Sequence, residues 1–195
     1  NVKILKAAQV SYEEGVAFPI LLGDRDVILA LMEEYNVELP EVTIIDPKAD
    51  SEEERRTNFG KEFFQRRKRK GLTEFEAVKL MRERNHFGAM MVDQGDADAM
   101  ITGLTRSYRS SVSPAIRIVG LEKDVNTVSG MYILNSKRGP LFLADTTVNM
   151  NPTAQVLADT TILTAAEVKR FNIDPKIALL SYSNLSISFY RLWCQ

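Results

Sequence analysis

Helical and extended patterns alternate along this chain, and that alternation restricts the possible folds more than any other feature of the sequence. Apolar residues recur at helical spacing over residues 2–14, and the apolar run at 16–22 follows as an expected buried strand. A helix over 24–35 and a strand over 42–46 repeat the same order. Helices that alternate with strands favour an α/β domain with a largely parallel sheet.

Several of the expected helix starts carry residues that can satisfy free backbone amides. Asp24 is the expected cap of the helix over residues 24–35. Ser51 with Glu54, and Thr73 with Glu76, match the capping box, in which two side chains pair with the first amides of a helix. We therefore expect one helix to begin at each box.

The second half of the chain continues the alternation, with one local exception. Extended segments at 127–134 and 140–146 flank a turn at 136–139 and predict a hairpin. Further strands are expected at about 98–102 and at 176–183. Cap-and-proline pairs mark two further helix starts: Ser113-Pro114, and Asn151-Pro152 before a long helix that ends near Phe171.

The length of 195 residues is compatible with one large domain or two small ones. We expect a helix near 112–118 to carry the chain from a first lobe, residues 1–115, into a second lobe that begins at 116 and extends to 184. The composition does not change at this boundary, so the expectation depends on the helix alone.

The composition excludes several classes of protein. One Cys and one His cannot form an internal disulfide or a four-ligand structural zinc site. No apolar run approaches the length of about 20 residues that spans a membrane. Lys and Arg number 25 against 26 Asp and Glu, whereas a nucleic-acid-binding domain is usually basic. We expect a soluble, cytoplasmic protein without a membrane or nucleic-acid partner.

Three features allow a chemical interpretation but favour a structural one. The basic run at 66–70 can contact phosphates, yet cations also suit the C-terminal end of a helix, and Gly71 ends this one. His86 is a possible general base, but no nucleophile with an orienting partner lies near it in the sequence. Cys194 lies one residue from the end of the chain, where catalysis is not expected.

Polar clusters follow three of the expected strands. In a parallel sheet these strand ends share one edge, where α/β proteins bind anionic ligands. Each cluster taken alone also suits a turn or a cap. No glycine-rich dinucleotide or Walker motif is present. The candidate ligand-binding residues are Thr102, Gly103, Thr105, Arg106, Ser107, Asn149, Asn151, Ser181, Ser183 and Asn184.

Four ordered motifs resemble the phosphate acetyltransferase (phosphotransacetylase) family. They are PILLGD at 19–24, GDADAMITGLTRSY at 95–108, LADTTVNMNPTAQVLAD at 143–159 and KIALLSYSN at 176–184. The segment RNHFGAMMVDQGDADAMITGLTR at 84–106 is similar to the phosphotransacetylase-type domain at the C-terminus of bacterial NADP-dependent malic enzymes.

The resemblance implies a three-layer α/β/α fold with two lobes, similar to that of isocitrate dehydrogenases and incomplete here at both ends. It also implies a coenzyme A site in the cleft and a homo-oligomer, a dimer or larger. In the acetyltransferases an Arg that helps to bind acyl phosphate precedes the proline that matches Pro114, but here that position is Ser113. A late Ser-Arg-Gly loop of the family is also absent. Residues 185–195 depart from the family pattern, and we expect a poorly packed, anomalous tail.

Three functions therefore remain open. The leading one is a fragment of the acetyl-CoA-responsive regulatory and oligomerisation domain of an NADP-dependent malic enzyme. The parent's oxidative decarboxylation of malate to pyruvate, with its NADP and divalent metal, would then lie in N-terminal domains, and this fragment would have no catalytic or metal-binding residue. The alternatives are a working phosphate acetyltransferase, which exchanges acetyl between phosphate and coenzyme A, and a catalytically dead oligomerisation domain.

Overall fold

The computed structural model describes residues 1–123 and 125–180, which fall into two compact units. Unit 1 is Asn1–Gly120, and unit 2 begins at Leu121. Within these described residues, no helix is long and apolar enough to cross a membrane.

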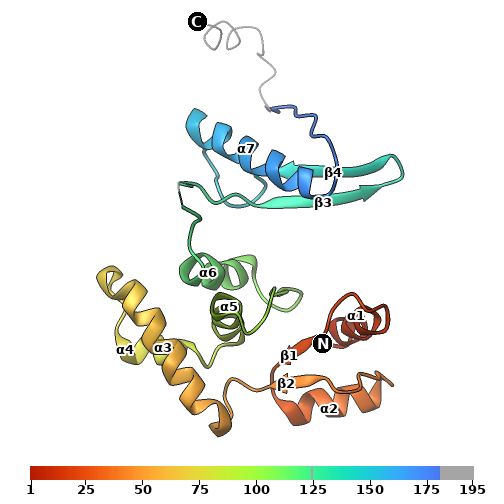
Figure 1. Cartoon of the computed structure of the whole chain (residues 1–195), viewed down its shortest axis with the longest axis vertical. Coiled ribbons are helices and arrows are strands. Elements are labelled where there is room, and N and C mark those ends of the chain that lie inside the picture. Colours follow the sequence, from red (N-terminus) through yellow and green to blue (C-terminus); the bar gives the residue numbers. More distant parts are fainter. Residues whose placement is uncertain (124, 181–195) are drawn as a thin grey trace, which may run out of the picture. The chain divides into compact units, whose positions relative to one another are not determined.

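Unit 1 has an α/β architecture, and unit 2 contains a hairpin and one long helix (Figure 1). The elements of unit 1 are α1 (Val2–Glu13), β1 (Ile20–Leu22), α2 (Arg25–Glu34), β2 (Thr43–Ile45), η1 (Asp50–Glu52), α3 (Glu53–Arg67), η2 (Lys68–Lys70), α4 (Glu74–Leu80), α5 (Arg84–Gln94) and α6 (Tyr108–Ile118). Those of unit 2 are β3 (Met131–Ser136), β4 (Gly139–Ala144) and α7 (Ala154–Arg170).

A parallel pair of strands, β1 and β2, separates two helical layers in unit 1. Leu21 pairs with Ile44, and both pack in a core cluster with apolar residues of α1 and α2. The next pair, Leu22 and Ile45, packs against the larger core formed by α3, α4, α5 and α6. Because successive strand residues face opposite sides, two short strands divide the core into the expected α/β/α layers.

Helices α3 and α4 approach each other closely at a glycine. A Cβ atom added to Gly60 would lie 2.6 Å from the Cα of Val78. The start of α4 is fixed by the predicted capping box, since the Thr73 hydroxyl accepts from the Glu76 amide and the Glu76 carboxylate accepts from the Thr73 amide. The sequence therefore placed this helix start correctly.

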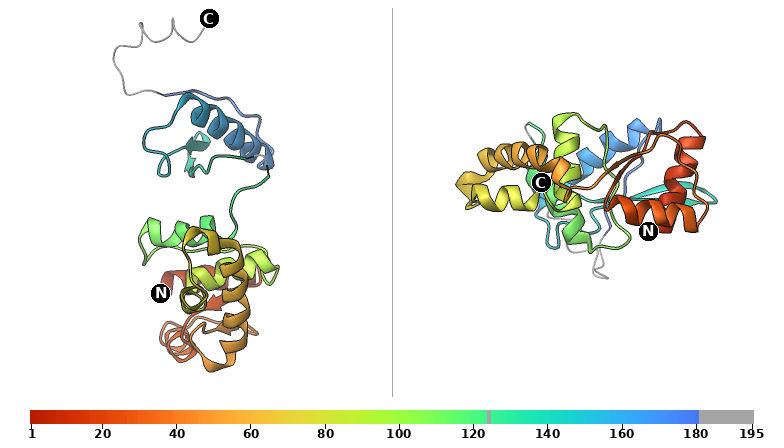
Figure 2. Two further views of the ribbon diagram at one scale, coloured as in Figure 1. Left: turned by 90° about the vertical axis from the view of Figure 1, so that its left-hand side faces the viewer. Right: turned by 90° about the horizontal axis from the view of Figure 1, so that it is seen from below.

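In unit 2, the predicted hairpin of β3 and β4 packs against α7 (Figures 1 and 2). The strands are antiparallel, and Ile133 pairs with Phe142. The Phe142 ring lies 5.4 Å, centroid to centroid, from that of Phe171, which ends α7. The contact between these rings anchors one end of the helix to the hairpin.

The expected strand over residues 16–22 is much shorter in the structure. The amides of Val16 and Ala17 bond back to the Ser11 carbonyl and so extend the end of α1. Pro19 then has no amide to donate to a ladder, and β1 begins at Ile20. Val16 remains 73% exposed, contrary to the prediction of a buried strand.

Two further strand predictions were wrong within the described residues. The segment at 98–102 forms no ladder, and side chains hold it instead: Met100 packs against the core, and the Thr102 hydroxyl donates to Asn85. Residues 176–180 are also not a strand, and 181–183 lie outside the described residues. The largely parallel sheet is therefore a single parallel pair in the described chain.

Three predicted helix caps are not used in the structure. Ser51 lies inside η1, so α3 begins after Glu52 and has no side-chain cap. Helix α6 begins after Ser107, whose side chain accepts from the Ser110 amide, and Pro114 lies inside the helix rather than at its start. In α7 the cap is Thr153, beyond the Asn-Pro pair. In both α6 and α7, the helix begins after the residue whose hydroxyl accepts from the amide three residues ahead.

Candidate functional site

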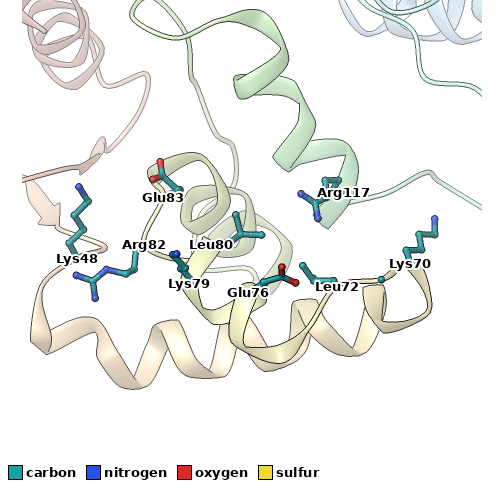
Figure 3. Close-up of a pocket in the computed structure, with 10 residues that line it drawn as sticks. Lys48, Lys70, Leu72, Glu76, Lys79, Leu80, Arg82, Glu83 and Arg117 are labelled. Carbon is teal, nitrogen blue, oxygen red and sulfur yellow. The ribbon is translucent and has the colours of Figure 1, made fainter.

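A basic depression of about 640 Å³ in unit 1 is the candidate site (Figure 3). It collects residues from the loop after β2, the turn between η2 and α4, helix α4, the turn before α5, and the last turn of α6. We call this depression the basic groove. Its lining residues are Lys48, Lys70, Gly71, Leu72, Glu76, Lys79, Leu80, Arg82, Glu83 and Arg117.

Cations outnumber carboxylates in the basic groove by five to two. Both carboxylates already have partners. The backbone amide and then the hydroxyl of Thr73 lower the pKa of Glu76, which therefore stays ionised in its capping box. Glu83 Oε2 lies 3.5 Å from Nη1 of Arg106. The net charge of the groove is therefore positive in a chain whose total formal charge is only −1.

The five groove cations differ from the paired arginines elsewhere in unit 1. Arg66 Nη1 lies 2.7 Å from Asp93, and Arg55 Nη2 lies 2.6 Å from Asp96. Among the described residues no groove cation forms a salt bridge of this kind. Arg117 instead lies over the Phe63 ring, 5.4 Å from its centroid. Unpaired cations around one depression are the arrangement that a multiply charged anion can neutralise.

Helix α5 begins at the edge of the basic groove. Its N-cap residue is Glu83, whose side chain forms no capping hydrogen bond. Among the described residues, the first amides of this 11-residue helix have no side-chain acceptor, and the helix dipole adds positive potential there. This potential has the same sign as the groove cations.

The predicted loop at 102–107 meets the basic groove through one residue. Arg106 contacts Glu83, which lines the groove. Thr102 is 2.9 Å from Asn85 Oδ1, the Thr105 amide donates to the Gly103 carbonyl, and Ser107 caps α6. The structure thus brings Arg106 to the groove and uses Thr102 and Ser107 in hydrogen bonds of the loop and helix.

The predicted cluster around Asn149 belongs to unit 2. Asn149 Nδ2 donates to the Val128 carbonyl at 2.8 Å and to Asp145 Oδ2 at 2.6 Å, so both amide hydrogens are engaged. Burial raises the pKa of Asp145, but amides including those of Val148 and Gly130 outweigh it and lower the pKa overall. This network stabilises the turn after β4.

The remaining predicted site residues lie elsewhere. Asn151 is exposed in unit 2 just before α7. Ser181, Ser183 and Asn184 lie outside the described residues, as does the predicted tail at 185–195. The pocket that would join them to the loop at 102–107 stays a prediction.

His86 lies beside the groove in the first turn of α5. Burial, followed by the charge of Arg117, lowers its pKa to about 4, while Glu83 opposes the shift. Both ring nitrogens are buried and have no hydrogen-bond partner among the described residues. The Phe63 ring packs near it, 6.2 Å between centroids. A neutral imidazole with so low a pKa is a weak base, which favours the structural interpretation of His86.

Sequence reasoning missed most of the groove. Lys48, Lys79, Arg82 and Arg117 belong to no motif and are spread over 70 residues of chain. Among the groove cations, only Lys70 belonged to a feature that the sequence singled out, the basic run at 66–70. Lys70 is the last residue of η2, which follows α3. In the part of the chain that the structure describes, no cluster of three or more potential metal ligands occurs.

Comparisons with known proteins identify the family of the chain. Residues 1–188 match the family model for phosphate acetyl/butaryl transferase. The phosphate acetyltransferase of Synechocystis is 32% identical over 186 residues, 94% of this chain and 26% of that protein. The NADP-dependent malic enzyme of Escherichia coli is 34% identical over 187 residues, 95% of this chain and 25% of that protein. The chain thus spans about a quarter of the length of these relatives.

Solved structures give the same family. A phosphotransacetylase from Streptococcus pyogenes matches with a TM-score of 0.81 and 32% identity, over 96% of this chain and 56% of that one. The EutD phosphotransacetylase of Staphylococcus aureus matches with a TM-score of 0.78 and 29% identity, over 92% and 53%. With a family model that covers almost the whole chain, this protein belongs to the phosphate acetyl/butaryl transferase family.

Proposed function

We propose that this chain binds coenzyme A or acetyl-CoA as the regulatory and oligomerisation domain of a cytoplasmic, NADP-dependent malic enzyme. The observation that carries the ligand class is the basic groove, whose five cations form no salt bridge within the described part of the chain and lie beside Arg106. Coenzyme A carries a pyrophosphate and a 3′-phosphate, which need several cations at once. A volume of about 640 Å³ also lies within the range of small-molecule sites.

The choice of parent rests on one position in α6. Ser113 stands directly before Pro114, where the resemblance to acetyltransferases implies an Arg, and its hydroxyl adds no positive charge. Stabilising the charge that develops during acyl transfer to phosphate requires a cation or an equivalent donor. A malic enzyme domain that senses acetyl-CoA has to bind this ligand but does not have to stabilise a transition state. Malate oxidation, NADP and a divalent metal would then belong to other domains of the polypeptide.

The second candidate is a phosphate acetyltransferase, which the matches to enzymes of that name favour. Two measurements on the 195-residue chain separate the candidates. Calorimetric titration with coenzyme A tests binding, and formation of acetyl-CoA from acetyl phosphate tests turnover. Binding without turnover supports the regulatory domain, and turnover supports the transferase. The absence of both binding and turnover supports a dead oligomerisation domain. The intact mass of the native protein then shows whether a malic enzyme domain is attached.

The role of the groove is tested with matched variants. Arg82→Ala and Arg106→Ala each remove one charge-assisted contact, worth about 1.5–3 kcal/mol, or about 10- to 100-fold in affinity. Lys61→Ala and Arg109→Ala remove exposed cations that do not line the groove and should leave affinity unchanged. In an intact malic enzyme, Arg106→Ala should weaken the acetyl-CoA response and leave malate turnover without effector nearly unchanged. Equal affinities for all four variants would refute the assignment.

A further inference from the structure

Asn85 connects two segments that flank the candidate site. It lies in the first turn of α5, where its Nδ2 donates to the Ser110 carbonyl of α6 at 3.1 Å. Its Oδ1 accepts from the Thr102 hydroxyl at 2.9 Å. One side chain therefore bonds both to helix α6 and to the loop at 102–107.

The Ser110 carbonyl is available because of a proline in α6. In an α-helix, a carbonyl accepts from the amide four residues ahead. For Ser110 that residue is Pro114, which has no amide hydrogen and lies inside the helix. Asn85 therefore supplies the donor that the proline lacks, and the hydrogen bond to the free Ser110 carbonyl connects α5 to α6.

The chemistry of the side chain explains how one residue can bond to both segments. A primary amide carries a donor and an acceptor on the same terminal group. Asn85 uses the donor on the Ser110 carbonyl and the acceptor on the Thr102 hydroxyl. An aspartate has no donor for the carbonyl, and an alanine has neither group. The two bonds together fix the loop with respect to the helix.

The two segments that Asn85 joins each carry an arginine of the candidate site. The loop carries Arg106, which contacts Glu83, and α6 carries Arg117 in its last turn, which lines the basic groove. We propose that Asn85 is a positioning residue that holds the Arg106 loop in place relative to the helix that bears Arg117. The effect of Asn85 on ligand affinity rests on the proposed function. Its effect on the order of the loop at 102–107 does not depend on that function.

Hydrogen exchange in the full 195-residue chain, followed by mass spectrometry, tests the ordering directly. Within the peptide 101–106, the Thr105 amide donates to the Gly103 carbonyl. Asn85→Ala should increase the exchange rate of this amide about fivefold, the effect of losing one net hydrogen bond. Thr102→Val should do the same, and Thr102→Ser, which keeps the hydroxyl, should not. Because the two residues share one hydrogen bond, the double variant Asn85→Ala/Thr102→Val should exchange no faster in this loop than Asn85→Ala alone.

Asn58→Ala is the matched control, since Asn58 is an exposed asparagine of α3. It should leave exchange at 101–106 unchanged. Thr102 is exposed, so its variants keep the test valid if Asn85→Ala does not fold. Unchanged loop exchange in Thr102→Val, or additive effects in the double variant, would overturn the inference.

Titration with coenzyme A, measured on the same variants, separates this inference from the proposed function. If both hold, Asn85→Ala and Thr102→Val should weaken binding about fivefold and Asn58→Ala should not. If the unmodified chain binds no coenzyme A but loop exchange changes as described, the proposed function fails and the positioning role of Asn85 stands. If it binds coenzyme A and the loop variants exchange normally, the positioning role fails and the proposed function stands.

Discussion

The stability of the fold should depend on pH through the titration of His86, the only histidine in the chain. In the folded state the pKa of His86 is lowered to about 4, first by burial and then by the charge of Arg117. In the unfolded chain its pKa is the ordinary value of about 6.5. Because the folded state binds this proton less readily, His86 lowers stability as the pH falls from about 6.5 toward 4, and it has no effect above that window.

The magnitude follows from the difference between the two pKa values. At about 1.4 kcal/mol per pH unit, the difference between pKa values of about 6.5 and about 4 sets an upper limit near 3.5 kcal/mol. His86 is only partly buried, and solvent screening reduces the effect to about 1–2 kcal/mol. Carboxyl groups with lowered pKa values, such as Asp93 and Asp145, titrate at lower pH. The change between pH 7.5 and pH 5 therefore belongs mainly to His86.

Two NMR measurements test this prediction. The imidazole Cε1–H resonance comes from a single residue and gives the pKa of His86 directly. Urea unfolding followed at the methyl groups of Met81 and Met90, both fully buried in unit 1, gives the free energy of unfolding at each pH. His86→Phe removes the titrating group and should abolish the change between pH 7.5 and pH 5. A pKa of 6 or higher, or equal wild-type stability at both pH values, would refute the reasoning.

Three further predictions concern activity and packing. The chain should form no acetyl-CoA from acetyl phosphate and coenzyme A, and Ser113→Arg alone should not create turnover; activity above a protein-free control would contradict this. Gly60→Ala should destabilise unit 1 by about 1–3 kcal/mol in urea unfolding, because its Cβ would lie 2.6 Å from the Val78 backbone; an unchanged midpoint would show that α3 and α4 separate freely. Asp145→Asn weakens an acceptor of four backbone amides, so hydrogen exchange at 145–149 should accelerate, and equal protection would contradict its role in this turn.

Local signals in the sequence located most helices correctly. The helix at the N-terminus, the Asp24 cap, the Thr73 capping box and the end of α7 near Phe171 all agree with the structure. These features depend on side chains that bond to backbone within a few residues, so the information lies within each segment. The hairpin of β3 and β4 was predicted for the same reason.

Strand predictions failed where a partner was needed. The segment at 98–102 was expected to form a strand, but it is held by Met100 in the core and by the bond from Thr102 to Asn85. A strand exists only when a neighbouring backbone completes its hydrogen bonds, and a single segment does not contain that information. The same reason explains why only β1 and β2 pair in parallel among the described strands.

By itself, the sequence determined the α/β class, the family and most helix positions, because periodicity, caps and motifs are encoded locally. Only the tertiary structure brought Lys48, Arg82 and Arg117 to one groove and placed Arg106 beside Glu83. It also showed that Pro114 lies inside α6 rather than at the start of a helix, and that Asn85 donates to the Ser110 carbonyl, which Pro114 cannot bond. Charges and donors far apart in the chain act together only at distances that packing sets, and no local pattern records those distances.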